Sequence, residues 1–146
     1  LTLANGVVTP AKMASCVAGD YEEYFTSKGT SIKNSYVEYF MAWDVLTARA
    51  GTVRVRFQLG KSAGAGTVYA RVYRNGYSEG SEHSTSASES APANFYDDLA
   101  VNSADHVQIY IRCTYAAGEY VNLLNPGICV GNPLRAAETW QRPKIV

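Results

Sequence analysis

Between Thr52 and Gly76 the chain contains two runs in which apolar and polar residues alternate strictly, and these runs constrain its fold more than any other feature. The apolar positions are Val53, Val55, Phe57 and Leu59 in the first run, and Val68, Ala70 and Val72 in the second. Successive side chains of a β-strand point to opposite faces, so a period of two predicts strands with one buried face. A glycine-rich turn separates the runs, and we interpret them as a pair of strands at the centre of one sheet.

The second run leads into Asn75-Gly76, a dipeptide typical of two-residue hairpins, because a type I′ turn needs positive φ at both central residues. Such a turn would pair Arg74 with Tyr77 and Val72 with Glu79. Glu79 would then lie on the apolar side of the sheet. We therefore expect either a β-bulge in the returning strand or a hairpin tip that extends beyond the core.

Other short segments rich in aromatic and β-branched residues also predict strands, at spacings near ten residues and with turn-forming residues between them. The clearest begins at His106, and its inward positions are Val107, Ile109, Ile111 and Cys113. About eight such strands predict an all-β fold, an antiparallel β-sandwich with jelly-roll or immunoglobulin-like connections.

Two further segments, residues 37–45 and the serine-rich tract, predict different kinds of structure. Residues 37–45 predict a strand with Tyr39, Met41 and Trp43 on one face, although Met41 to Ala50 could also turn helical. The serine-rich tract from Ser84 to Ser90 predicts a flexible surface crossing between strands.

The sequence divides into an N-terminal segment, residues 1–20, and a β-sandwich domain, residues 21–146. The first segment contains Asn5-Gly6, Thr9-Pro10 and a few small apolar residues, which do not resemble part of a packed sheet. It could be a frayed terminus. Because a frayed terminus would expose its apolar residues to water, we favour an extended arm that lies on a neighbouring subunit.

The net charge is zero and the pI is about 6.9, which argues against a general nucleic-acid binder. No stretch is long and apolar enough to predict insertion into a membrane. The three cysteines are widely spaced, so we expect neither a metal site nor a cofactor. Cys113 is expected to be a buried free thiol, and a Cys113–Cys129 disulfide between neighbouring predicted strands is the alternative.

Catalytic signatures are not found in the sequence. His83 and His106 stand outside any motif, and we expect both to be surface polar residues. Asp97 and Asp98 are adjacent, so in a strand their side chains point to opposite faces and make a poor acid–base pair. We therefore expect a protein that is not an enzyme.

Arginine and tyrosine dominate the outward positions of the predicted strands, and they are the candidate interface or ligand face. The set is Arg54, Arg56, Tyr69, Arg71, Tyr73, Tyr110 and Arg112. If their strands share a sheet, these residues form one patch. The patch could be cross-strand stacking on a solvated sheet, a subunit interface, or a sugar-binding surface on which tyrosine rings stack against pyranose rings.

Two features together resemble viral structural proteins. The segment NGVVTPAKMAS is similar to the linkers that precede terminal domains in phage tail fibres and related tail proteins. The order ARAGTVRVRFQLGKS, GTVYARVYRNG and DLAVNSADHVQIYIR resembles the β-sandwich domain that often follows such linkers. The resemblance implies a virion component (tail fibre, baseplate or head decoration) in an extracellular particle.

The same resemblance implies partners and a role. Such proteins are usually homo-oligomers, often trimers, that contact other virion proteins and in some cases attach to a host-surface glycan. We therefore expect a non-enzymatic virion structural protein. The alternative is a carbohydrate-binding adhesin module that uses the exposed tyrosines and arginines.

Overall fold

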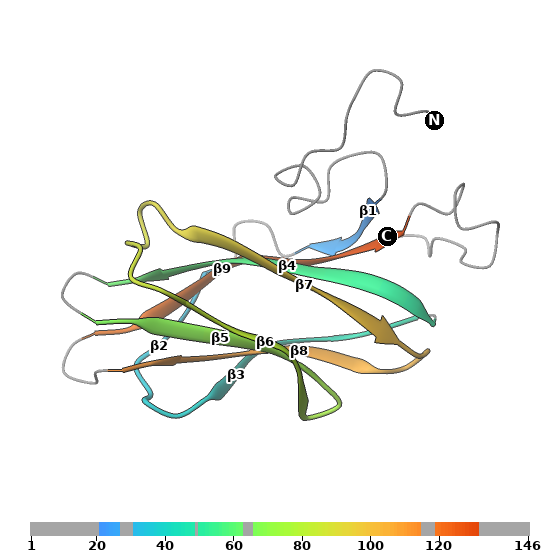
Figure 1. Cartoon of the computed structure of the whole chain (residues 1–146), viewed down its shortest axis with the longest axis horizontal. Helices are drawn as coiled ribbons and strands as arrows, with labels where there is room; N and C mark the ends of the chain where they lie inside the picture. Colours follow the sequence, from blue (N-terminus) through green and yellow to red (C-terminus); the bar gives the residue numbers. More distant parts are fainter. Residues whose placement is uncertain (1–20, 27–30, 49, 63–65, 115–118, 132–146) are drawn as a thin grey trace, which may run out of the picture.

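The computed structural model describes residues 21–26, 31–48, 50–62, 66–114 and 119–131. Over these ranges the chain forms nine strands and no helix, arranged in two antiparallel sheets that pack face to face (Figure 1). This arrangement confirms the predicted β-sandwich. The strands are β1 (Tyr21–Thr26), β2 (Ser31–Asn34), β3 (Phe40–Leu46), β4 (Gly51–Lys61), β5 (Val68–Arg74), β6 (Tyr77–Thr85), β7 (Ala93–Val101), β8 (His106–Cys113) and β9 (Val121–Gly131).

The strand order is that of a jelly roll. One sheet has the order β1-β9-β4-β7, with β2 beside the other half of β9, and the second sheet has the order β3-β8-β5-β6. The chain crosses between the sheets at almost every step, as expected for this fold. Among the described strands, β5 and β6 are the one consecutive pair that hydrogen-bond to each other.

The predicted pairing of the two alternating runs is therefore wrong. The first run is β4, which pairs with β7 and β9, and the second is β5, which pairs with β6 and β8. Their inward faces were predicted correctly, because the apolar residues of both runs belong to one buried core. The two strands face each other across that core instead of lying side by side.

The core fills the space between the sheets. Its fully buried members include Phe57, Leu59, Ile109, Ile111, Leu123 and Ile128, together with valines of β4, β5, β8 and β9. Each sheet contributes every second residue, so the interior is almost entirely aliphatic. Removal of this apolar surface from water is the main force that holds the sheets together.

The β5–β6 hairpin has the predicted turn and the predicted bulge. Asn75 has φ 52° and Gly76 has φ 84°, and Arg74 pairs with Tyr77. The register then shifts before Glu82, which confirms the bulge. Glu79 is turned away from the core and accepts hydrogen bonds from Arg74, 3.0 Å from Nε and 2.8 Å from Nη2.

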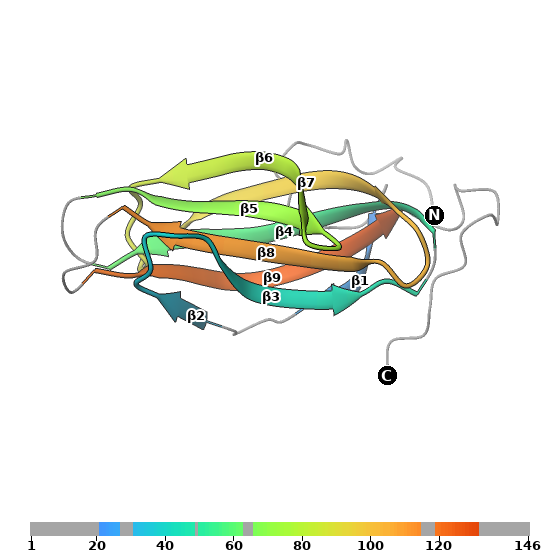
Figure 2. The same cartoon turned by 90° about the horizontal axis from the view of Figure 1, so that it is seen from below.

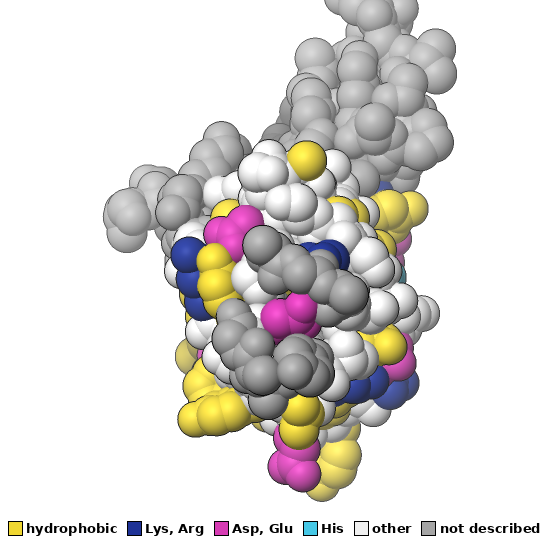
Figure 3. Space-filling view, turned by 90° about the vertical axis from the view of Figure 1, so that its left-hand side faces the viewer, with side chains coloured by type: hydrophobic (Ala, Val, Ile, Leu, Met, Phe, Trp, Pro, Cys, Tyr) yellow, Lys and Arg dark blue, Asp and Glu magenta, His cyan; other side chains and the backbone are white. Residues whose placement is uncertain are grey.

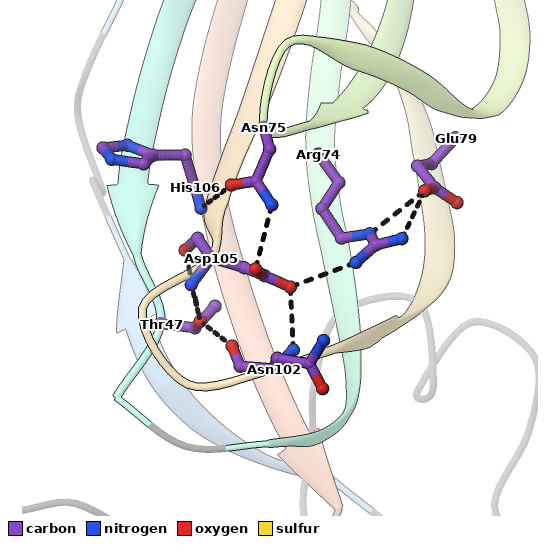
Figure 4. Close-up of polar contacts among 7 residues, drawn as sticks. All are labelled: Thr47, Arg74, Asn75, Glu79, Asn102, Asp105 and His106. Carbon is purple, nitrogen blue, oxygen red and sulfur yellow. Dashed lines mark hydrogen bonds and ion pairs between the residues drawn. The ribbon is translucent and has the colours of Figure 1, made fainter.

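A buried carboxylate ties this hairpin to the end of the sandwich (Figure 4). Asp105, in the turn between β7 and β8, accepts hydrogen bonds from the Asn102 backbone at 2.8 Å, the Asn75 side chain at 2.9 Å and Arg74 at 3.2 Å. These bonds, the Asn102 backbone bond first, lower the pKa of Asp105. Thr47 bonds to the same turn from the β3–β4 connection.

The strand predicted over residues 37–45 is confirmed from Phe40 to Leu46, and the alternative helix after Met41 does not form there. The predicted common face of Met41 and Trp43 is wrong, because a bulge between them turns Met41 outward, opposite Tyr110, while Trp43 stays in the core. The flexible crossing predicted from Ser84 to Ser90 is also wrong. Strand β6 continues to Thr85, and Ser88 forms a β-bridge with Lys61 of β4.

Cys113 is a buried free thiol, as predicted. The alternative Cys113–Cys129 disulfide is wrong, because Cys113 is not disulfide-bonded. Cys113 faces the core, while Cys129 pairs with Arg54 on the outer side of the other sheet and takes part in a disulfide that does not involve Cys113. The predicted arm, residues 1–20, and the chain after Gly131 lie outside the described residues. No helix capable of crossing a membrane occurs in the ranges described.

Candidate functional site

Five of the seven predicted residues lie together on the outer face of the β3-β8-β5-β6 sheet, which Figure 2 shows from outside. They are Tyr69, Arg71 and Tyr73 of β5 and Tyr110 and Arg112 of β8. β5 and β8 are hydrogen-bonded neighbours, with Tyr69 opposite Arg112 and Arg71 opposite Tyr110. We call these five residues, with Tyr39 and Glu82, the Tyr/Arg face.

Arg54 and Arg56 belong to the other sheet, so the single patch of seven residues does not form. Arg54 makes a two-pronged ion pair with Asp98, with both N–O distances 2.7 Å, and lies 3.9 Å from the ring centre of Tyr96. Its side chain is 3% exposed, so it is structural. Arg56 donates a hydrogen bond to the Asn125 carbonyl at 3.2 Å.

Aromatic rings and a guanidinium form a continuous strip across the Tyr/Arg face. The rings of Tyr73 and Tyr110 are stacked, with centroids 4.0 Å apart and planes inclined by 30°. The Arg112 guanidinium lies 3.8 Å from the Tyr69 ring centroid and 5.3 Å from that of Tyr39. Each of these four tyrosines and Arg112 is half-buried, so part of every side chain in the strip remains exposed to solvent.

Tyr39 and Glu82 complete the face, and sequence reasoning missed both. The Tyr39 hydroxyl donates a hydrogen bond to the Glu82 carboxylate, which also lies 3.7 Å from Arg112 Nη2. Burial, and next the bond to Glu82, raise the pKa of Tyr39, so the hydroxyl remains a donor at neutral pH. One indication of Glu82 was present in the sequence: the predicted hairpin put Glu79 on the apolar side of the sheet. A bulge that corrects this position also changes which residues of β6 face outward.

Arg71 lies at the centre of the face and makes few polar contacts with the described residues. Its Nε donates a hydrogen bond to the Gly80 carbonyl at 2.9 Å. In the described part of the chain, it makes no ion pair, and its two Nη atoms donate no hydrogen bond.

A shallow groove of about 370 Å³ adjoins the face at Tyr39, and its other lining residues are Tyr36, Val37 and Glu38. The Tyr36 carbonyl accepts a hydrogen bond from the Cys113 backbone at 2.9 Å, which fixes this segment beside the end of β8. Hydrophobic side chains gather on the lower side of this end of the molecule, where β3 and β8 lie (Figure 3). Tyr36 and Val37 are 62% and 50% exposed.

The histidines and the paired aspartates have structural partners. His83 was expected on the surface, but it is half-buried, contacts the rings of Phe57 and Phe95, and bonds to Asp97 at 2.8 Å. Asp97 and Asp98 do point to opposite sides. His106 lies 3.1 Å from Asp44. Within the described ranges, no three histidine, cysteine or carboxylate side chains come together as metal ligands.

No protein-family model matches the sequence, and no curated protein is similar to it. Solved structures share the fold. The EclA C-terminal domain, described as a sugar-binding protein, is 4% identical with a TM-score of 0.52, over 70% of this chain and 79% of that domain. A family 35 carbohydrate-binding module from Clostridium thermocellum is 12% identical (TM-score 0.47; 75% and 98% covered). Eiger TNF from S. frugiperda is 14% identical (TM-score 0.48; 88% and 100% covered).

Proposed function

We propose that this protein is a non-enzymatic carbohydrate-binding module that binds saccharides on the Tyr/Arg face. The observation that carries the proposal is the stacked pair of Tyr73 and Tyr110 on the outer surface of a sheet. Tyrosine rings offer an apolar face to the C–H groups of a pyranose ring, and their hydroxyls remain available for hydrogen bonds. A strip of such rings on a rigid scaffold fits an extended saccharide.

The polar groups of the face are of the kinds that bind sugar hydroxyls. Arg71 supplies N–H donors, and Glu82 supplies acceptor oxygens beside the Tyr39 hydroxyl. The EclA domain, whose description names a sugar-binding protein, has the same scaffold and is consistent with the proposal. Function belongs to the site and not to the fold, so the Tyr/Arg face must be tested directly.

The test is a broad glycan array probed with the full chain. We expect binding that Tyr73→Ala and Tyr110→Ala abolish or strongly weaken. Tyr96→Ala is the matched control, because Tyr96 is a 40% exposed tyrosine on the opposite sheet and contacts Arg54. If the array is silent, or if Tyr96→Ala weakens binding as much as Tyr73→Ala, the proposal is wrong.

A second candidate function is assembly into a viral particle, as the resemblance to tail proteins implies. The observation that favours it is the contact between the exposed rings of Tyr36 and Phe40, with centroids 5.5 Å apart, in a segment that also exposes Val37 and Met41; each of the four side chains is at least 43% exposed. Contiguous exposed apolar residues are typical of protein–protein contacts. Native mass spectrometry should then detect a trimer or larger oligomer that Val37→Glu disrupts, and removal of residues 1–20 should prevent particle formation. A monomer at high concentration would contradict this function.

A further inference from the structure

We infer that the Tyr/Arg face selects saccharides that carry a carboxylate, and that Arg71 binds the carboxylate. This inference rests on the proposed function and narrows it from saccharides in general to acidic ones, such as oligomers of a hexuronic acid.

The first support is the pairing of the arginines. Arg54 is bonded to Asp98 at 2.7 Å, Arg74 to Glu79 at 2.8 Å, and Arg112 lies 3.7 Å from Glu82. Arg71 has no such carboxylate among the described residues, and its one hydrogen bond there is from Nε to the Gly80 carbonyl. That bond fixes the guanidinium and leaves both Nη atoms for a ligand.

The second support is the chemistry of those two nitrogens. A planar guanidinium edge matches the two oxygens of a carboxylate, and the resulting pair of charge-assisted hydrogen bonds is stronger than bonds to neutral hydroxyls. Neutral sugars cannot make this pair. An anion would also offset a positive charge that the protein itself leaves uncompensated on this face.

The third support is the position of Arg71 among the rings. Tyr69 and Tyr73 stand two residues away on the same side of β5, and Tyr110 is its cross-strand partner in β8. Opposed side chains on neighbouring strands start about 5 Å apart. A pyranose ring can therefore stack on the Tyr73–Tyr110 pair while a carboxylate on its rim reaches Arg71.

Glu82 does not cancel this preference. It is the one carboxylate of the Tyr/Arg face, and it accepts the Tyr39 hydroxyl bond and lies beside Arg112. Glu82 is also the cross-strand partner of Arg71 in β6, but among the described residues its carboxylate forms no ion pair with Arg71 and instead contacts Tyr39 and Arg112. The face retains an excess of one positive charge, from two arginines and one glutamate.

The test compares two ligands that share one sugar backbone, one with charged carboxylates and one with neutral methyl esters. We would measure binding of trigalacturonic acid and of its methyl ester to the full chain by calorimetry at low ionic strength. We expect the free acid to bind about tenfold tighter or more, a preference that salt reduces. Arg71→Gln should remove the preference without abolishing binding of the ester, and Arg71→Lys should restore part of it.

Lys33→Gln is the matched control, because it removes the same charge from a 51% exposed side chain on β2. It should leave the preference unchanged, and circular dichroism should show that all variants are folded. Equal affinity for acid and ester, or a preference that Arg71→Gln leaves intact, would overturn this inference. The proposed function would still stand in that case, provided that Tyr73→Ala weakens saccharide binding as expected. Absence of binding to every saccharide on the array would overturn the proposed function as well.

Discussion

The guanidinium of Arg112 lies 3.8 Å from the ring centroid of Tyr69, its cross-strand partner, and is held on its other side by Tyr39 and Glu82. The neighbouring cross-strand pair reverses the order, with Arg71 on β5 and Tyr110 on β8. Tyr110 stacks on Tyr73 instead of on Arg71. Arg112 is therefore part of the scaffold of the face, while Arg71 is available to a ligand.

The tyrosine pair should act as one binding unit. Tyr73→Ala and Tyr110→Ala should each weaken saccharide binding about tenfold, and the double variant should lose little more than either single one. Each ring rests on the other at 4.0 Å, so removing one leaves its partner free to move. Calorimetric titration of the three variants measures this coupling. Losses that simply add would show that the rings bind independently.

Asp98→Ala should destabilise the fold more than Arg54→Met. Arg54 is 3% exposed whereas Asp98 is 39% exposed, so Asp98→Ala removes the carboxylate that neutralises a buried charge, at a cost of about 3 kcal/mol. Arg54→Met keeps apolar contact with Tyr96 and leaves a carboxylate that water can solvate. Urea unfolding at pH 7 measures both free energies. Glu79→Ala, at an exposed ion pair, is the control and should cost much less. The reverse order of Asp98→Ala and Arg54→Met would contradict this account.

Acid should loosen the attachment of the β5–β6 hairpin through Asp105. Hydrogen bonds from Asn102, Asn75 and Arg74 lower the pKa of this carboxyl in the folded state. Its stabilising contribution is therefore complete above the ordinary pKa of about 4 and is lost as the pH falls below it. The free energy of unfolding of the wild type should fall more steeply below pH 4 than that of Asp105→Asn. Parallel curves would show that Asp105 contributes nothing to acid sensitivity.

Gly60→Ala should destabilise the contact between β4 and the chain before β7. A Cβ at this position would lie 2.6 Å from the Glu89 Cα, which is backbone and cannot move aside without shifting the whole segment. Overpacking of this kind costs about 1–3 kcal/mol. The melting temperatures of Gly60→Ala and of the control Ser88→Ala test whether overpacking is the cause. Ser88→Ala adds no atoms to the same contact, so it should lower the melting temperature less. An unchanged melting temperature for Gly60→Ala would show that the segment is not held against β4.

Local chemistry was sufficient for several features of the fold. Asn75 and Gly76 adopt positive φ as the type I′ turn requires, and the misplaced Glu79 indicated the bulge. The face of the sheet that Tyr69 and Arg112 occupy follows from their alternation with core residues. The bulge beside Met41 carried no comparable signal, because either register there places a large side chain in the core.

The sequence by itself determined which residues of each strand face the core, because that choice depends on the chemistry of side chains two residues apart. Tertiary structure alone decided which strands are neighbours. Strands pair through backbone groups that all residues share, so local pattern cannot show that β4 joins β7 and β9 while β5 joins β6 and β8. Because of this strand pairing, Arg54 and Arg56 lie on one side of the sandwich, and Arg71 lies among the tyrosines on the other side.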